Sequence, residues 1–112
     1  MRYMLMIADD GAERLSPTEI DATPEFVAWL REVESRGGSR VGTLLRPAPE
    51  AVTVRVRDGQ LLRTDGPFAE TKEHIAGVEI VECADLDDAI AIASTHPAAG
   101  HHPIEIRPFW ED

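Results

Sequence analysis

The chain has 112 residues, which is enough for one domain with one hydrophobic core and too few for two independent cores. Hydrophobic residues make up 43% of it and charged residues 29%, values typical of a globular protein rather than of a disordered or membrane-spanning one. We therefore expect residues 1–112 to form a single domain. Its formal net charge of −10 repels phosphate backbones and anionic lipids, so we expect it to bind neither nucleic acid nor membranes.

The cellular address expected from the sequence is the cytoplasm. Cys83 is the only cysteine, so no disulfide can form within the chain, which is consistent with a reducing compartment. The apolar run at 4–8 is too short for a secretory signal or a membrane span.

The first third of the chain predicts a strand followed by a helix. Residues 2–8 are apolar on both alternating faces, which is typical of a central strand. Ser16 and Glu19 have the spacing of a capping box with Pro17 at the first helical position, and Thr23-Pro24 offers a second start signal. We expect one helix here, kinked near Pro24 and ending at the glycine pair 37–38.

The middle of the chain predicts four short strands. Residues 39–45 form a weaker strand, and 52–57 alternate valine with threonine and arginine before Asp58-Gly59, a pair that suits a type I′ hairpin turn. Residues 61–64 would be the return strand. The arginines of this hairpin could attract a small anion, but a solvated strand face is the simpler interpretation. Residues 75–82 form the next strand, in which Gly77 marks a bulge or a close approach.

The last third predicts a helix and a final strand. Asp85 is a good N-cap, residues 86–93 repeat apolar side chains at helical spacing, and the helix must stop near His96-Pro97. Residues 104–107 alternate isoleucine with charged residues as a strand would. The element order predicts an α+β fold: a ferredoxin-like split βαβ plan with an antiparallel sheet and an inserted β-hairpin. Two helices cover one face of such a sheet, so we expect a second subunit, in a homodimer, to cover the other.

A nine-residue motif adds a family resemblance. Residues 65–73, DGPFAETKE, match the signature of the DGPF group, and the chain resembles this group of the YCII-related family. Further matches follow in the family's order: the first five residues, the strand at 53–55, the acidic helix start at Asp85, His96-Pro97, and residues 105–108.

The resemblance implies a bacterial protein of ferredoxin-like fold whose dimer forms an α/β barrel, often encoded beside extracytoplasmic-function sigma factors. The broader YCII-related group is associated with enzymatic activity through a histidine in the first helix and an aspartate in an Asp-Pro pair after the second. Here the first helix has no histidine, and the pair is His96-Pro97. The departure argues against an inherited His-Asp chemistry.

Residues 65–74 hold the strongest candidates for a site. We predict proton transfer by His74, oriented by Glu70 or Asp65, because histidine titrates near neutrality and a carboxylate can fix its tautomer. A second set of side chains is expected to contact the ligand: Lys72, Arg63 and His96. A purely structural alternative stands beside this one. Asp65, Gly66 and Pro67 are suited to a tight turn, and the polar residues after them could form ordinary ion pairs in solvent.

The sequence gives little support for a metal site, a cysteine nucleophile or a bound cofactor. His101 and His102 are adjacent and would point to opposite faces of an extended segment, so we expect no metal site. His96 suits a helix C-terminus, where a cation meets the negative end of the dipole. Cys83 has no basic neighbour in sequence and is expected to be a buried small hydrophobe. No phosphate-binding loop or dinucleotide fingerprint is present, so no cofactor is expected.

The sequence leaves two functions of different classes open. The first is a cofactor-independent enzyme that acts on a small polar or aromatic molecule in a cleft of the dimer. The second is a non-catalytic ligand-sensing or accessory protein tied to a sigma-factor system, as the resemblance implies.

Overall fold

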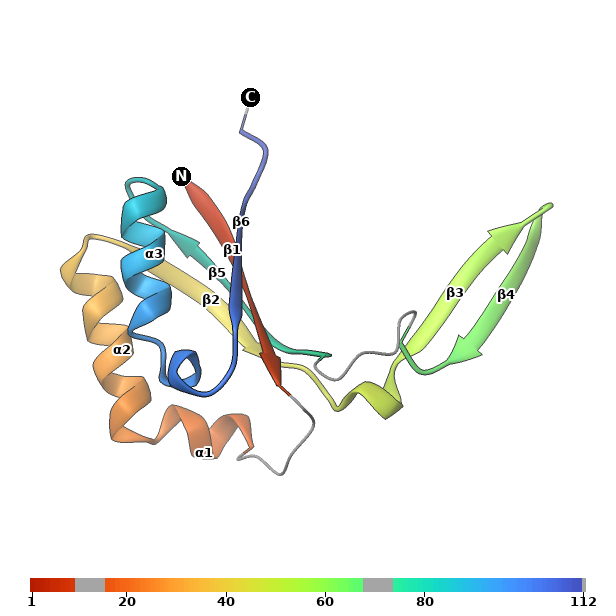
Figure 1. The fold of residues 1–112 in the computed structure, drawn as a ribbon, viewed down its shortest axis with the longest axis horizontal. Coiled ribbons are helices and arrows are strands. Elements are labelled where there is room, and N and C mark those ends of the chain that lie inside the picture. The colour runs from red at the N-terminus through yellow and green to blue at the C-terminus, as the bar shows by residue number, and fades with distance from the viewer. Residues whose placement is uncertain (10–15, 68–73, 112) are drawn as a thin grey trace.

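The computed structural model describes residues 1–9, 16–67 and 74–111 (Figure 1). In chain order the elements are β1 (Arg2–Asp9), α1 (Pro17–Asp21), α2 (Pro24–Ser35), β2 (Ser39–Leu44), the 3-10 helix η1 (Ala48–Glu50), β3 (Val52–Arg57), β4 (Gln60–Asp65), β5 (His74–Glu82), α3 (Leu86–Ser94), the 3-10 helix η2 (Pro97–Gly100) and β6 (Ile104–Pro108). Among the described residues no helix is long and apolar enough to cross a membrane.

Four strands form the main sheet in the order β2-β5-β1-β6, and every neighbouring pair is antiparallel. The strand β5 therefore separates β1 from β2, which are joined through α1 and α2. This is the split βαβ arrangement that the element order predicted, and it is compatible with a ferredoxin-like fold. The pairing of β1 with β5 shifts register between Ile7 and Ala8, opposite Gly77, so the predicted irregularity at that glycine is confirmed.

The helical segment after β1 differs from the single kinked helix that we expected. It forms two helices, because each start signal caps a helix of its own. Ser16 and Glu19 make the reciprocal hydrogen bonds of a capping box at α1, and the Thr23 hydroxyl accepts the Phe26 N–H at the start of α2. Pro24 has no N–H to donate back into α1, so the first helix ends before it.

The core lies between one face of the main sheet and the helices α2 and α3. Tyr3 and Leu5 of β1 and Val81 of β5 point into it, and Trp29 and Val33 of α2 meet Ile92 of α3 there. All of these side chains are almost fully buried. Burying this apolar area is the main source of the free energy of folding.

The other face of the main sheet carries apolar residues that the described helices do not cover. Met4 and Met6 of β1 lie beside Val78 and Ile80 of β5, and all four are half-buried, whereas Val41 of β2 is 65% exposed. We call these five residues the open face. Their positions follow from strand alternation, since each lies one residue away from a side chain that enters the core.

The hairpin of β3 and β4 projects away from the sheet and helices (Figure 1). Asp58 and Gly59 form its turn with φ values of 52° and 76°, which confirms the positive φ values that a type I′ turn requires. At its base the Gly66 N–H donates to the Ala51 carbonyl oxygen at 2.7 Å.

Candidate functional site

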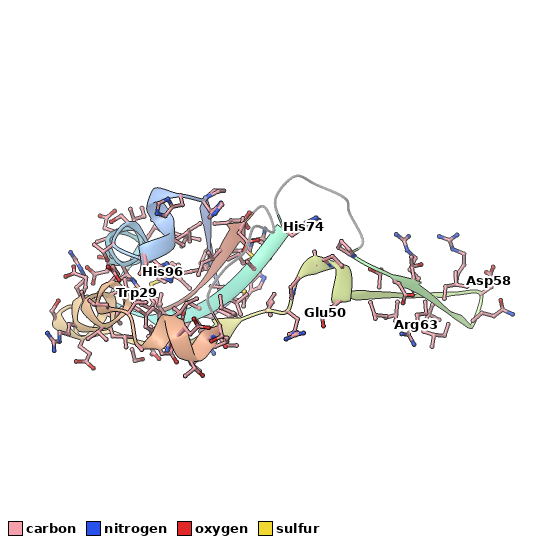
Figure 2. All side chains as sticks on the ribbon, turned by 90° about the horizontal axis from the view of Figure 1, so that it is seen from below. Trp29, Glu50, Asp58, Arg63, His74 and His96 are labelled. Atoms are coloured by element: carbon pink, nitrogen blue, oxygen red, sulfur yellow. The ribbon has the colours of Figure 1, made fainter. Side chains whose placement is uncertain are left out.

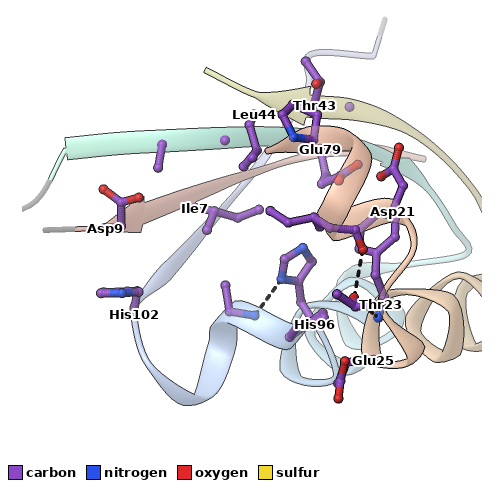
Figure 3. Close-up of a pocket in the computed structure, with 18 of the residues that line it drawn as sticks. Ile7, Asp9, Asp21, Thr23, Glu25, Thr43, Leu44, Glu79, His96 and His102 are labelled. Atoms are coloured by element: carbon purple, nitrogen blue, oxygen red, sulfur yellow. Dashed lines mark hydrogen bonds between the residues drawn. The ribbon is translucent and has the colours of Figure 1, made fainter. Parts of the chain in front are cut away.

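A pocket of about 560 Å³ opens between the helix-covered face of the main sheet and the segments α1, α2 and η2. Its volume lies within the range of small-molecule sites. The apolar part of the wall comes from Ile7 of β1, Ile20 of α1, Phe26 of α2 and Leu44 of β2. Figure 3 shows how these elements surround the space, with His96 approaching from η2 and Glu79 from the sheet.

A buried ion pair forms the polar part of the wall on the sheet side. Glu79 of β5 is 4% exposed, and its carboxylate accepts two hydrogen bonds from the Arg40 guanidinium of β2, at 2.9 and 2.7 Å. The two-point geometry satisfies both carboxylate oxygens, which a buried carboxylate needs in order to remain charged. Gly42 lies directly opposite Glu79 in the register of β2 and β5, and its missing side chain leaves the space that the carboxylate occupies.

Aromatic rings enclose the arginine from the helix side. The Arg40 guanidinium carbon lies 5.2 Å from the centre of the Phe26 ring and 5.8 Å from that of Trp29. Both distances allow cation–π attraction. The Trp29 indole N–H donates to the Ile92 carbonyl oxygen at 2.8 Å, which fixes the ring between α2 and α3.

His96 completes this group, with its ring 4.7 Å from the Trp29 ring in an edge-to-face arrangement. Its Nδ1 accepts the Ala98 N–H at 3.0 Å and thereby caps the helix η2. Burial, together with the nearby positive charge of Arg40, lowers the pKa of His96 from 6.5 to about 4. Our expectation of a cationic His96 at a helix C-terminus is therefore wrong: the residue does follow α3, but its ring is neutral near pH 7.

The neutral ring has a defined tautomer. Because Nδ1 accepts a hydrogen bond, the proton resides on Nε2. Figure 3 shows the nitrogen that is not bonded to Ala98 directed into the pocket. The site therefore presents a neutral N–H donor within largely apolar surroundings.

Three further carboxylates lie in the pocket wall. Asp9 of β1, Asp21 of α1 and Glu25 of α2 all line it, whereas Arg40, already paired with Glu79, is the cationic side chain among the described lining residues. The electrostatic potential at the pocket therefore disfavours an anionic ligand.

Comparison with known proteins places the chain in a family. The model of the YCII-related domain matches residues 1–111. The chain belongs to the YCII-related family. It is similar to the "Uncharacterized protein R00369" of Rhizobium meliloti (strain 1021), with 40% identity in an alignment of length 100; the match covers 72% of this chain and 79% of the relative. Membership of the narrower DGPF group stays a prediction from residues 65–73.

The sequence-predicted site residues of this YCII-related protein lie in different places. Asp65 and Arg63 are exposed on β4, where their side chains approach each other at 3.7 Å, and Figure 2 shows Arg63 far out on the hairpin. His74 begins β5 and pairs in register with Asp9, at the end of the sheet near the pocket. Glu70 and Lys72 lie outside the described residues, so their convergence with His74 stays a prediction.

Of the predicted residues that the structure describes, His96 lines the pocket, whereas Arg63, Asp65 and His74 are not among its lining side chains. Gly66 has a φ of 97°, which confirms that the turn at 65–67 requires a residue free to adopt the left-handed region. This observation favours the structural interpretation of that turn.

Sequence reasoning missed Arg40 and Glu79. A signal for Glu79 was present, because alternation places it on the same face of β5 as the buried Val81. Arg40 lies 39 residues away along the chain, and only the pairing of β2 with β5 brings the two together.

Cys83 behaves as expected from the sequence. It is buried, and burial raises the pKa of its thiol above the ordinary value. The protonated thiol lies 3.5 Å from the Asp85 carbonyl oxygen. The N-terminal ammonium, which donates to the Cys83 carbonyl oxygen at 2.9 Å, favours the thiolate, but burial outweighs it and the thiol is not activated as a nucleophile.

Proposed function

We propose that this YCII-related protein binds a small, mostly apolar, neutral molecule in the pocket, and that His96 recognises a hydrogen-bond acceptor on it. The observation that carries the proposal is the neutral imidazole whose Nδ1 is engaged by Ala98 and whose other nitrogen is directed into the cavity. A carbonyl or ether oxygen would accept a hydrogen bond from its Nε2–H. Apolar walls supply the binding energy, and one placed donor supplies orientation.

The electronic character of His96 favours binding and polarisation over proton abstraction by this residue. An imidazole with a pKa of about 4 is a weak base, and the lone pair it retains is already used by the Ala98 N–H. A neutral imidazole can still polarise a carbonyl by donating to it. Both functions considered from the sequence, an enzyme and a ligand sensor, begin with such a binding step.

The charges around the pocket support a neutral ligand. Glu79 neutralises Arg40, and the carboxylates of Asp21 and Glu25 also line the cavity. An anion would meet net repulsion there. A ligand with an uncharged acceptor avoids that cost and still pairs with His96.

Two probe molecules of nearly the same shape test the proposal. Acetophenone has a carbonyl acceptor, and ethylbenzene lacks it. We expect the wild-type protein to bind acetophenone about fivefold to tenfold more tightly, as one net hydrogen bond would give. The affinities would be measured by NMR titration, following the indole N–H of Trp29, which lies beside His96.

The variant His96→Asn is the matched control for the donor. Its side-chain oxygen can still cap the Ala98 N–H, but it has no group at the position of Nε2. We expect the preference for acetophenone to disappear while ethylbenzene binds as before. Equal affinities of the wild-type protein for both probes, or shifts confined to residues outside the pocket, would refute the proposal.

We further propose that two copies associate through the open face. Four half-buried apolar side chains and the 65% exposed Val41 would leave water there. This arrangement is the one expected of the dimeric α/β barrel that the family resemblance implies.

A further inference from the structure

The carboxylate of Glu79 can accept more hydrogen bonds than the described part of the chain gives it. An ionised carboxylate offers about four lone-pair sites. Within the described ranges its side-chain hydrogen bonds come from Arg40, whose Nε donates to Oε2 at 2.9 Å and whose Nη2 donates to Oε1 at 2.7 Å. Each oxygen therefore keeps the capacity to accept a further hydrogen bond.

The pocket is the side from which a further donor can approach this carboxylate. Glu79 lies over Gly42, where an added Cβ would overlap its Oε2, so the backbone of β2 closes the carboxylate from below. The Arg40 guanidinium occupies a second side. Both Glu79 and Gly42 line the pocket, and Figure 3 shows Glu79 on the sheet side of the space and His96 on the side of η2. A molecule in the pocket can therefore meet both side chains.

The charges at Glu79 select an uncharged donor. A hydroxyl or amide N–H can donate to the buried carboxylate, and hydrogen bonds to an ionised acceptor are stronger than those between neutral groups. An ammonium ion in the same place would meet the positive charge of Arg40, which lies 2.7 Å from the carboxylate. An anion has no hydrogen to donate and would meet the negative charge of Glu79 itself.

We propose that Glu79 accepts a hydrogen bond from a hydroxyl or an uncharged N–H group of the molecule that the pocket binds. This inference rests on the proposed function, and it adds a donor for Glu79 to the acceptor for His96. The ligand class becomes that of small, mostly apolar molecules with one group of each kind, such as hydroxylated aromatic ketones. A buried ion pair adds little stability compared with apolar residues of the same size, whereas a fixed, charged acceptor has a use in binding.

Three probe molecules of similar size test the donor. Meta-ethylphenol has a hydroxyl, meta-ethyltoluene has a methyl group of the same shape, and meta-ethylanisole keeps the oxygen but has no hydrogen to donate. The para isomers are measured in the same way. We expect the better ethylphenol isomer to bind about tenfold more tightly than either matching control. NMR titration follows the Nε–H of Arg40, which is bonded to Glu79 and should shift more with the phenol than with the controls.

The variant Glu79→Gln tests the acceptor. Its side chain has nearly the same size, and its oxygen can still accept from Arg40, but it has lost the negative charge. We expect its preference for ethylphenol to fall below about threefold. Glu82→Gln makes the same change at an exposed position on β5 and should keep the tenfold preference. Circular dichroism establishes that each variant is folded. If Glu79→Gln does not fold, the wild-type affinities and the Arg40 Nε–H shift decide.

The outcomes separate this inference from the proposed role of His96. Equal affinities of the wild-type protein for ethylphenol and its controls, or a preference that Glu79→Gln retains, would overturn the role of Glu79. A preference for acetophenone over ethylbenzene would still support His96 in that case. Conversely, a phenol preference that depends on Glu79 stands even if acetophenone and ethylbenzene bind alike. If none of these molecules binds, both proposals are wrong.

Discussion

His96 shows how one side chain can be held in a chosen protonation state by its surroundings. Phe26 and Trp29 exclude water from its ring, and Arg40 adds a positive charge that opposes protonation. The unfolded chain has neither effect, so there the imidazole titrates near its ordinary pKa of 6.5. The difference between the two states links His96 to the stability of the protein.

We expect the free energy of unfolding to fall as the pH drops from 7 to 5, with His96 contributing about 1 kcal/mol of the loss after allowance for its partial exposure. Between pH 6.5 and about 4 the unfolded chain binds a proton that the folded protein does not, so stability rises with pH in that window. The contribution is fully present above pH 6.5 and is lost toward pH 4.

Urea denaturation of the wild-type protein and of His96→Asn at pH 7 and pH 5 measures this contribution. The variant retains a cap for Ala98 and all other titrating groups, so the difference between the two pH dependences isolates His96. Equal losses in both proteins would show that the ring is not held neutral by the fold.

At the residue scale, sequence reasoning predicted His96 as a ligand contact, and the structure places it in the pocket wall, but the charge expected for its ring was wrong. Its position after α3 follows from the end of the apolar repeat and from Pro97, both of which are local. Its desolvation comes from Phe26, Trp29 and Arg40, which are distant along the chain. A pKa depends on such neighbours, so it could not be predicted from local sequence.

The pairing of β2 with β5 leaves no room for a side chain at position 42, which is a glycine. A Cβ added at Gly42 would overlap the Val78 carbonyl oxygen and the Glu79 carboxylate, and neither can move without breaking the strand pairing or the ion pair with Arg40. We expect Gly42→Ala to lower the free energy of unfolding by about 3 kcal/mol. Denaturant titration followed by circular dichroism measures the effect.

Gly100, at the end of η2, is the control for that substitution. A Cβ there would meet no atom within 4 Å, so Gly100→Ala should change the stability by less than about 0.5 kcal/mol. Similar losses for both variants would mean that the close approach at Gly42 is relieved by a small shift of β2.

At the element scale most of the fold could be predicted from the sequence. Alternation located β1, β3, β5 and β6, and the capping residues Ser16 and Asp85 located the starts of α1 and α3. These signals are local, and the structure confirms them. Thr23-Pro24 was recognised as a start signal, but the separation into two helices was not predicted, because it depends on α1 ending through its own hydrogen bonds at Ala22 and Thr23.

At the scale of the whole molecule, the two faces of the main sheet have different surroundings. The helices cover one face, and the proposed second copy covers the other. Val41 lies on the open face and is exposed in the single chain, so Val41→Asp should leave the stability of that chain nearly unchanged. In a dimer formed through the open face, the buried carboxylate should weaken association by about tenfold or more.

The variant Ile90→Asp makes the same chemical change on the outer side of α3, where Ile90 is 48% exposed. It should leave association unaffected. Size-exclusion chromatography with light scattering compares the three proteins, and a dimer that tolerates Val41→Asp as well as Ile90→Asp would exclude the open face as its interface.

The contrast between the two tryptophans gives the molecule an optical reporter of its own. Trp29 is 1% exposed and packs against the His96 ring, whereas Trp110 near the C-terminus is 94% exposed. Indole emission shifts to longer wavelength in water, so the buried Trp29 emits at shorter wavelength than Trp110, and Trp29 lies beside a histidine whose protonated form quenches indole. With Trp110 replaced by phenylalanine, the remaining fluorescence comes from a ring in contact with the pocket histidine, and its intensity follows the protonation and occupancy of the site without any added label.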